Sequence, residues 1–439
     1  MSVKPDKVFD VLKKRMLVDG FDIVIDMDKS QGSYIVDARN GKKYLDFYTF
    51  FASSALGMNH PRLNNEEFKE KIFKPAITKV ANSDIYTTYM AEFVDTFSRI
   101  AMPDYFQYLF LISGGALAVE NALKVSFDWK VRKNFAKGMK EEKGHKVIHF
   151  KDAFHGRTGY TLSLTNTADP RKYMYFPKFD WPRVLNPKII FPLEENIEDI
   201  KKAEEESISQ INEAIKKEGD DIAALIIEPI QCEGGDNFFR KEFFQELRKI
   251  CDENEIMLVF DEVQTGMGIT GKMWAHEYYV KPDILCFGKK FQICGIIASK
   301  RVEEVEKNCF EESSRINSTW GGNLVDMVRA TRILEVIEDE KLVENARRQG
   351  ELLLKILHDI QKDFPDMISN VRGLGLLCSF DMPDTDTRDE FRKRCLEEGM
   401  IVLPCGKRSI RFRPILCVKE EQIREADERM RTVLTKMKK

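Results

Sequence analysis

Three short segments of the sequence place charged residues or glycines directly after apolar runs that resemble buried strands. The segment Ser113–Ala116 contains two glycines, Asp261 ends the second apolar run, and Lys289 follows the third. Because the carboxyl ends of parallel strands share one edge of a sheet, where α/β proteins bind their ligands, we expect these three segments to meet at one site.

The glycine-containing segment could bind a phosphate group. Gly114 and Gly115 precede Ala116–Lys130, whose apolar residues have helical spacing. Glycine permits a sharp turn from strand to helix, and a helix N-terminus presents free N–H groups together with the positive end of its dipole. An ordinary tight strand-to-helix turn would contain the same glycines.

The other two segments could bind an aldehyde cofactor. A desolvated lysine at the ligand edge of a sheet is the side chain that forms a Schiff base with such a cofactor. Two adjacent lysines, Lys289 and Lys290, are available, and both could instead lie on the surface. Asp261 could likewise be a helix cap or a salt-bridged residue, but three such features at one sheet edge together favour a binding site.

A fourth segment imitates a dinucleotide-binding motif. Gly266–Gly271 has the G-x-G-x-x-G spacing, but the fingerprint requires its glycines directly after the strand and a helix of several turns after them. Asp261–Thr265 intervene here, and Pro282 ends the segment early. A nicotinamide-dependent dehydrogenase is therefore only a remote alternative.

Strand-like and helix-like runs alternate from about residue 80 to 320, which is typical of an α/β fold with a largely parallel sheet. The predicted strands are Tyr108–Ile112, Lys146–Phe150, Ala223–Ile227, Met257–Phe260, Ile284–Phe287 and Gly295–Ser299. Helical spacing without proline predicts helices at Ala116–Lys130 and Lys241–Asn254.

The two ends of the chain have a mixed pattern. N-terminal alternation predicts antiparallel strands at Phe21–Met27, Ser33–Asp37 and Tyr44–Tyr48. The C-terminal part predicts helices at Leu324–Glu338 and Ala346–Phe364, strands near Leu376–Phe380 and Ser409–Phe412, and a final helix from Lys419. We therefore expect residues 1–75 to join a smaller α+β domain at 326–439, with the large domain at 76–325.

Composition excludes several classes of function. The 439 residues are 43% hydrophobic and 32% charged, which is ordinary for a soluble globular enzyme. A net charge of −3 without a long basic run gives no electrostatic case for a nucleic acid or an anionic membrane as partner. The nine cysteines form no C-x-x-C pair, which favours a reducing compartment, and the six histidines have no metal-binding spacing. With neither an apolar signal segment nor a spanning run, we expect a cytoplasmic protein without a metal.

Over nearly its whole length the chain resembles the fold-type I, class III pyridoxal-phosphate aminotransferases. The most diagnostic part is the run Asp261–Gln264, followed by Pro282-Asp283 and Lys289. Further matching segments are Gly41–Asp46, Phe154–Thr158, Ile226–Pro229, Ser318–Asn323 and Arg372–Gly375. The resemblance implies pyridoxal 5′-phosphate as cofactor. It also implies a large domain with a mostly parallel sheet and a smaller α+β domain built from both chain ends.

The resemblance also implies roles for individual residues. The family's lysine lies six positions after the Asp of its P-D pair, which selects Lys289 over Lys290 as the residue that binds the cofactor. Asp261 would pair with the pyridinium nitrogen and keep it protonated. The other implied cofactor contacts are Gln264 at the phenolate oxygen, Val263 and Phe154 at the two ring faces, and Ser113, Gly114, Gly115 and Ala116 at the phosphate. Thr319 would reach the phosphate of the partner subunit, so the active site would belong to a homodimer.

Within the family, several segments look like the L-lysine 6-aminotransferase branch. These segments are Ser53–Pro61, Phe179–Pro182, Gln231–Asp236 and Asn317–Asn323. Ile269 stands where the family usually has arginine, which argues against the ornithine and acetylornithine branches. The implied reaction, a step of lysine catabolism, moves the ε-amino group of L-lysine to 2-oxoglutarate. It gives L-glutamate and 2-aminoadipate 6-semialdehyde, which cyclises to piperideine-6-carboxylate. Another ω-amino acid aminotransferase, acting on ornithine, 4-aminobutyrate or a diamine, is the alternative.

The two substrates of this reaction differ in charge at the reacting end. 2-Oxoglutarate has carboxylates at both ends, whereas lysine has none near its ε-amine. The resemblance implies that Arg411 binds the α-carboxylate of 2-oxoglutarate as a bidentate partner, and that Arg157 and Asn317 bind the far carboxylate of either substrate. Glu233 would cover Arg411 while lysine is bound. Arg413 could face inward in place of Arg411, and Glu233 could simply cap a turn.

Overall fold

The computed structural model describes residues 3–438, and its largest sheet has seven strands in the order β3-β9-β8-β7-β6-β4-β5. The strands are β3 (Phe106–Ile112), β4 (Lys146–Phe150), β5 (Arg183–Val184), β6 (Ile222–Ile227), β7 (Met257–Asp261), β8 (Ile284–Phe287) and β9 (Cys294–Ser299). β9 pairs antiparallel with β3 and β8, and the other neighbours pair in parallel. The predicted α/β fold with a largely parallel sheet is confirmed, and all six predicted strands lie within two residues of the observed bounds.

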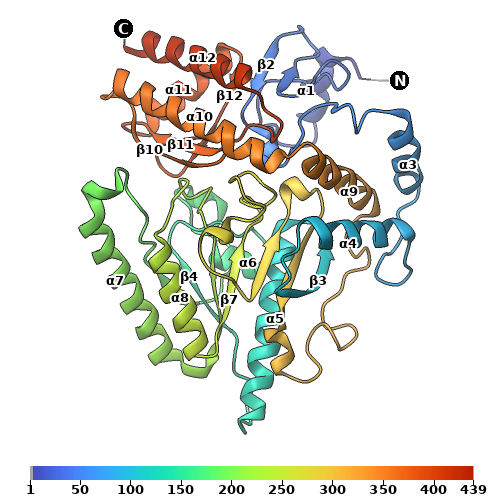
Figure 1. Ribbon diagram of the computed structural model, residues 1–439, viewed down its shortest axis with the longest axis vertical. Coiled ribbons are helices and arrows are strands. Elements are labelled where there is room, and N and C mark those ends of the chain that lie inside the picture. Colours follow the sequence, from blue (N-terminus) through green and yellow to red (C-terminus); the bar gives the residue numbers. More distant parts are fainter. Residues whose placement is uncertain (1–2, 439) are drawn as a thin grey trace.

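Different helices cover the two faces of this sheet (Figure 1). Side chains alternate along β6, so Ala224 and Ile226 join the hydrophobic cluster formed with α5 (Gly115–Ala136). Leu225 and Ile227 join a second cluster that contains Phe243, Phe244 and Leu247 of α8 (Lys241–Glu253). α7 (Leu193–Glu218) lies beside α8 (Figure 1). Because both faces are covered, the central strands are continuous apolar runs, which explains why the sequence revealed them.

The remaining elements form two smaller sheets and their helices. One sheet has the order β10-β11-β14-β13, and the other has the order β1-β2-β12. The strands are β1 (Tyr34–Val36), β2 (Lys43–Asp46), β10 (Ser369–Leu374), β11 (Leu377–Asp381), β12 (Met400–Ile401), β13 (Leu403–Cys405) and β14 (Ser409–Phe412). The helices are α1 (Val8–Leu12), α2 (Thr49–Ala52), α3 (Glu66–Ile77), α4 (Thr88–Ile100), α6 (Gly159–Leu164), α9 (Leu324–Asp339), α10 (Leu342–Asp363), α11 (Thr385–Glu397) and α12 (Glu420–Lys438). β2 pairs in parallel with β12, which joins the two chain ends, and the domain boundaries themselves stay a prediction.

One predicted strand is wrong. Phe21–Met27 forms no strand, and its pairing is limited to a single bridge between Ile25 and Asp37. Phe21, Ile23 and Ile25 instead pack against the small hydrophobic cluster of Ile35, Tyr44 and Ile401. The alternation in the sequence therefore reflects side-chain packing, with backbone pairing limited to this one bridge.

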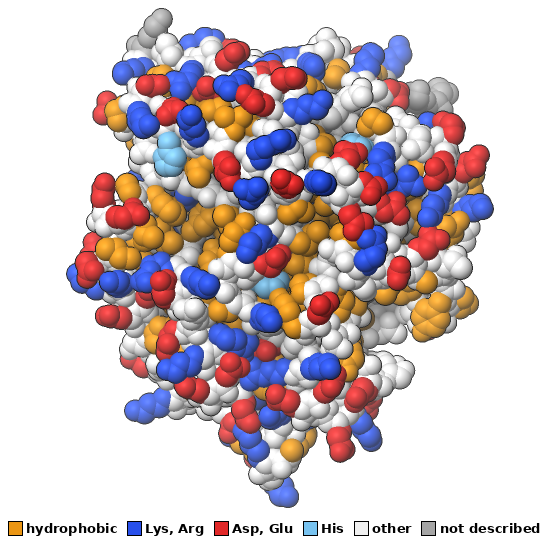
Figure 2. Space-filling view, in the orientation of Figure 1, with side chains coloured by type: hydrophobic (Ala, Val, Ile, Leu, Met, Phe, Trp, Pro, Cys, Tyr) orange, Lys and Arg blue, Asp and Glu red, His pale blue; other side chains and the backbone are white. Residues whose placement is uncertain are grey.

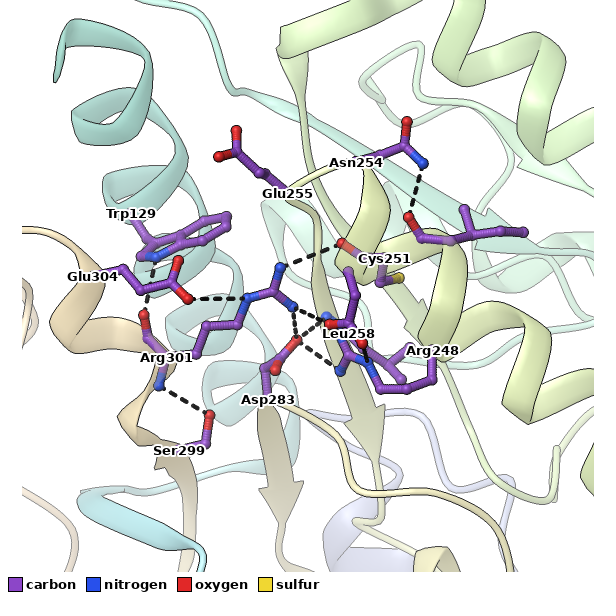
Figure 3. Close-up of polar contacts among 12 residues, drawn as sticks. Trp129, Arg248, Cys251, Asn254, Glu255, Leu258, Asp283, Ser299, Arg301 and Glu304 are labelled. Carbon is purple, nitrogen blue, oxygen red and sulfur yellow. Dashed lines mark hydrogen bonds and ion pairs between the residues drawn. The ribbon is translucent and has the colours of Figure 1, made fainter. Parts of the chain in front are cut away.

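A buried carboxylate fixes the amino ends of β7 and β8, opposite the edge that the sequence marks as functional. Asp283 Oδ2 accepts hydrogen bonds from Arg248 Nη1 (2.9 Å), Arg301 Nη1 (2.9 Å) and the Leu258 amide (2.8 Å), as shown in Figure 3. Asp252 Oδ1, which is mostly exposed, binds the same two guanidinium groups at 2.6 and 3.2 Å. Asp283, from the Pro282-Asp283 pair, therefore helps to hold β7 and β8 in register.

This arrangement predicts unequal costs for the two acids. Asp283→Ala should lower the free energy of unfolding by about 3 kcal/mol, because two mostly buried guanidinium groups and a buried amide lose their shared acceptor. The control Asp252→Ala removes an exposed partner of the same arginines and should cost less than about 1 kcal/mol. Urea unfolding followed by circular dichroism measures both values, and equal losses would contradict the assignment.

Acidic and basic side chains are interspersed over the face drawn in Figure 2. Within residues 3–438, no helix is long and apolar enough to cross a membrane. The nine cysteines are free thiols. Residues 3–438 include no group of three His, Cys, Asp or Glu side chains that could hold a metal ion. The cytoplasmic location stays a prediction.

Candidate active site

The sheet brings the three marked segments to one edge. β7 ends at Asp261, and β8 ends two residues before Lys289. β3 lies two antiparallel pairings away from β8, so it runs in the same direction and its carboxyl end, at Ser113–Ala116, faces the same edge. A Cβ atom at Gly115 would lie 2.9 Å from Val263 Cγ1, so the glycine turn is in contact with the loop after β7.

Gly114 gives the phosphate turn its shape. Its φ is 116°, which side-chain-bearing residues rarely adopt, and α5 begins at the next residue. The free N–H groups of this helix N-terminus point to the sheet edge, where an anion can accept from them. Ser113 and Gly114 are exposed, whereas Gly115 and Ala116 are half-buried.

Asp261 is held by a histidine whose role the sequence left open. His155 Nδ1 lies 2.8 Å from Asp261 Oδ2, and the Val263 amide donates to Asp261 Oδ1 at 3.1 Å. Both side chains are buried, and His155 Nε2 has no hydrogen-bond partner in the part of the chain that the structure describes. His155 therefore orients the carboxylate, with one Asp261 oxygen bound to the imidazole and the other to its own loop.

A second carboxyl group lies close by. Glu228, which follows β6, accepts a hydrogen bond from the Phe154 amide at 2.9 Å. Burial, together with the charge of Asp261, raises the pKa of Glu228 well above its usual range. Two carboxyl groups therefore lie at the strand ends, and Asp261 is the one that a histidine orients.

The adjacent lysines have different environments. Lys290 is buried, and its Nζ donates to the carbonyl oxygens of Ala52 (3.2 Å) and Gln264 (2.9 Å). Lys289 Nζ is bound to one carbonyl, that of Phe51, at 3.2 Å. Burial and the charge of Arg411 lower the pKa of Lys289, and burial lowers the pKa of Lys290 to about 7, so both amines lose a proton more easily than an exposed lysine does. The two lysines differ in how many carbonyls their Nζ atoms bind.

Both lysines bind a backbone segment with an unusual conformation. Thr49–Ala52 forms a left-handed helical turn, with φ from 44 to 62°, which costs about 1–2 kcal/mol per residue. The Asp46 carboxylate accepts from the amides of Tyr48 and Thr49 at 2.8 Å each, which helps to hold the turn. The carbonyls at its end consequently face the lysines of the site.

Arg411 is covered by Glu233. Arg411 Nη2 lies 2.5 Å from Glu233 Oε2, and Arg411 Nη1 donates to Gln264 Oε1 at 3.1 Å. The other Glu233 oxygen binds Lys172 Nζ, a contact that no feature of the sequence indicated. Burial tends to raise the pKa of Glu233, but the charges of Arg411 and Lys172 outweigh it, and the pKa lies below its usual value.

The alternative candidate Arg413 has a partner of its own. Its Nη2 binds Asp236 Oδ1, and both side chains are fully buried. A guanidinium in such a closed pair is not available to a substrate, whereas the Glu233 side chain keeps 20% of its surface exposed. Arg411 is therefore the cation of β14 that faces the site.

The loop after β7 agrees with the sequence analysis. Gly266–Gly271 consists of turns, and no helix of several turns follows it, unlike a dinucleotide-binding segment. Ile269, which stands in place of the usual arginine, is 1% exposed and belongs to the main hydrophobic core.

Three predicted substrate or cofactor residues are not joined to the lysine or the arginine of this cluster. Arg157, Asn317 and Thr319 are exposed, and within residues 3–438 no hydrogen bond or ion pair joins any of them to Lys289 or Arg411. The Thr319 loop is bound to a different segment, since Ser83 Oγ donates to the Thr319 carbonyl at 3.0 Å. A single chain therefore leaves these side chains free for contacts from outside it.

Comparison with known proteins identifies the family. The family model "Aminotransferase class-III" matches residues 18–434. The chain belongs to the class III aminotransferases.

Individual members of this family are similar over almost the whole chain. The L-lysine-epsilon aminotransferase of Mycobacterium tuberculosis is 50% identical over 432 residues, which cover 98% of this chain and 96% of that protein. That of Streptomyces clavuligerus is 44% identical over 98% of this chain and 94% of that protein. A solved structure of the lysine aminotransferase from M. tuberculosis, in the internal aldimine form, is 49% identical and matches with a TM-score of 0.97 over 99% of each chain.

Pyridoxal 5′-phosphate is the cofactor of this aminotransferase, and the site fits it. The cofactor presents a phosphate, a pyridine nitrogen and an aldehyde. The structure offers a helix N-terminus after Gly114, the oriented carboxylate of Asp261, and the Lys289 amine with its lowered pKa. These three groups lie at one sheet edge. Val263, two residues after Asp261, contacts the glycine turn and so joins the phosphate position to the carboxylate.

The two lysines can be separated by experiment. Lys289→Ala should abolish covalent attachment of the cofactor, and transamination should fall by at least about a thousandfold, because the nucleophilic amine is lost. Lys290→Met should keep the attachment, since Lys290 Nζ donates to two backbone carbonyls and is not free to bind the cofactor. Borohydride reduction followed by peptide mass spectrometry locates the pyridoxyl group, and finding it on Lys290 would contradict the assignment.

Proposed function

We propose that this aminotransferase transfers the ε-amino group of L-lysine to 2-oxoglutarate and alternates between the two substrates at one site. The observation that carries the proposal is the ion pair between Glu233 and Arg411. The similarity to lysine aminotransferases over 98% of the chain supports lysine as the amino donor.

Glu233 and Arg411 form the arrangement that lysine requires. The ε-end of lysine is a methylene chain with an amine, and a bare guanidinium beside it would be a buried charge without a partner. The Glu233 carboxylate neutralises this charge, while the Gln264 oxygen accepts from the same guanidinium. The lysine carboxylate lies at the other end of the substrate, where Arg157 and Asn317 are expected to bind it.

The residues around the cofactor have distinct tasks. When bound, the cofactor supplies an electron-withdrawing ring that makes the carbon bearing the amine acidic. Asp261, oriented by His155, keeps the ring nitrogen protonated. Lys289 would hold the cofactor between turnovers, and its amine, whose pKa is lowered by burial, would move the proton at that carbon.

2-Oxoglutarate requires the opposite state of the same pair. Its α-carboxylate replaces the Glu233 carboxylate on Arg411, so the guanidinium again has one carboxylate partner. This new partner would bind through both of its oxygens. Glu233 must therefore leave Arg411 in this half of the cycle. The exchange allows one site to accept a substrate with one carboxylate and another with two.

A homodimer with shared active sites is part of the proposal. Large apolar side chains are exposed around α3 and the loop after it, and on the Thr319 loop: Phe73, Ile77, Ile85, Tyr86 and Trp320. The Asn82 side chain donates to the Trp320 carbonyl at 2.9 Å, so the two loops form one surface. A second copy of the chain would bury these side chains and carry Thr319 and Asn317 to the partner's cofactor and substrate.

The two half-reactions test the role of Glu233. Glu233→Gln should slow the lysine half-reaction by about 10- to 100-fold, because Arg411 loses its counter-charge, and should leave the 2-oxoglutarate half-reaction equal or faster. Stopped-flow absorbance of the cofactor follows each half-reaction separately. The control Glu390→Gln makes the same change at an acid of α11 that is paired with Arg394, and it should change neither half-reaction.

Two results would contradict parts of the proposal. Equal losses in both half-reactions for Glu233→Gln would reject the exchange at Arg411. A wild-type enzyme that is faster with ornithine, 4-aminobutyrate or a diamine than with lysine would assign it to another ω-amino acid branch.

Shared sites predict complementation between inactive chains. In a heterodimer of Lys289→Ala and Thr319→Ala chains, one of the two sites should combine an intact Lys289 with an intact Thr319 from the other chain. Mixed dimers should therefore recover about half of the wild-type activity per dimer, well above both homodimers. Activity no greater than the average of the two homodimers would show that Thr319 serves its own chain.

A further inference from the structure

Two cavities share a wall that contains Glu233. The larger cavity, of about 480 Å³, includes Arg411, Tyr48 and Phe51 in its lining. The smaller cavity, of about 270 Å³, is also lined by Glu233 and includes Gly406 in its lining. The residues that line both cavities are Lys172, Glu233, Arg392 and Pro404. The carboxylate that covers Arg411 therefore belongs to a partition between two spaces.

The backbone of Glu233 is fixed. Its carbonyl accepts from the Gly406 amide at 2.9 Å, and the next residue, Gly234, packs so closely that an added Cβ would lie 2.2 Å from the Asp152 carbonyl oxygen. The Gly235 carbonyl is bound by Arg372. Uncovering Arg411 therefore proceeds by rotation of the Glu233 side chain, and its new position must lie within the reach of that side chain.

The smaller cavity, which Glu233 itself lines, has three arginines in its lining. Two of the arginines in its lining already have acidic partners, Arg171 with Asp169 (2.7 Å) and Arg388 with Asp389 (3.0 Å). Arg392 differs from them: within residues 3–438 no hydrogen bond or ion pair reaches its guanidinium, and its Nε atom is buried. An unpaired guanidinium beside an exchangeable carboxylate is a ready acceptor for it.

We propose that Lys172 and Arg392 form a second seat for the Glu233 carboxylate, which Glu233 occupies while 2-oxoglutarate is bound to Arg411. The inference rests on the proposed function and extends it to two positioning residues. Lys172 binds Glu233 in the position seen here and retains it during the rotation. Arg392, on α11, gains its contact only after the rotation, and so it stabilises the uncovered state alone.

This difference makes Arg392 the informative residue. Arg392→Gln should weaken binding of glutarate, a dicarboxylate that cannot react, by about tenfold in isothermal titration calorimetry of the holoenzyme. The lysine half-reaction should stay within twofold of the wild type, since Glu233 then remains on Arg411. Arg392→Lys, which keeps the charge, should recover most of the glutarate affinity.

A matched control separates the seat from general electrostatics. Lys393 is the next residue of α11, is exposed, and lines the larger cavity but not the smaller one. Lys393→Gln removes the same charge and should change glutarate affinity by less than twofold. Equal losses for Lys393→Gln and Arg392→Gln would overturn the seat.

The decisive measurement combines substitutions. In a Glu233→Gln background the side chain has no charge to move, so adding Arg392→Gln should no longer change glutarate affinity. A loss that persists there would show that Arg392 contacts the dicarboxylate directly, and would overturn the seat. If Glu233→Gln alone biases the half-reactions while Arg392→Gln changes nothing, the seat is wrong and the covering role of Glu233 stands. If Glu233→Gln changes the lysine and 2-oxoglutarate half-reactions equally, both the covering role of Glu233 and the second seat are wrong.

Discussion

Two arginines extend into the interior, and the arrangement of the site depends on how their charges are compensated. Arg411 lies in β14 and Arg413 lies one residue beyond its end, and both are almost fully buried. Their acidic partners, Glu233 and Asp236, come from a single loop after β6. This loop must be held precisely enough to serve both, and the backbone bonds around Gly234 and Gly406 provide that constraint.

The two pairs differ in what surrounds them, and this difference separates structure from function. Asp236 and Arg413 have no exposed side-chain surface, so breaking their pair would leave two buried charges. Glu233 borders two cavities and has a second cation, Lys172, at its other oxygen. The same kind of ion pair is thus a permanent part of the fold in one case and an exchangeable part of the site in the other.

The sequence predicted the fold and the edge of the site because their determinants are local. Buried parallel strands are continuous apolar runs, and the turn at Gly114, Asp261 and Lys289 each follow such a run directly. The wrong strand at Phe21–Met27 shows the limit of this reasoning, since alternation indicates which side chains are buried and not whether the backbone pairs. Arg411 and Arg413 are only two positions apart at the end of one predicted strand, so the sequence alone could not choose between them.

The contacts that the sequence did not reveal join positions far apart in the chain. His155 lies 106 positions from Asp261, and Lys172 lies 61 positions from Glu233. No spacing rule relates such pairs, because their proximity depends on how strands β4, β6 and β7 are ordered in the sheet. The resemblance to the aminotransferase family pointed to Asp261 and Glu233. Only the three-dimensional arrangement identifies His155, which orients Asp261, and Lys172, which binds Glu233.

Charge conservation explains why a movable carboxylate suits this site. In the proposed cycle a carboxylate of 2-oxoglutarate replaces that of Glu233 on Arg411, so the guanidinium would keep one anionic partner throughout, and its own desolvation cost would not change. The cost is transferred to Glu233, which must find compensation within the reach of a side chain whose backbone cannot move. A carboxylate released into an uncharged cavity would be stabilised poorly and would favour lysine in both half-reactions. The two cations at the partition, Lys172 and Arg392, therefore determine how evenly the enzyme alternates between its substrates.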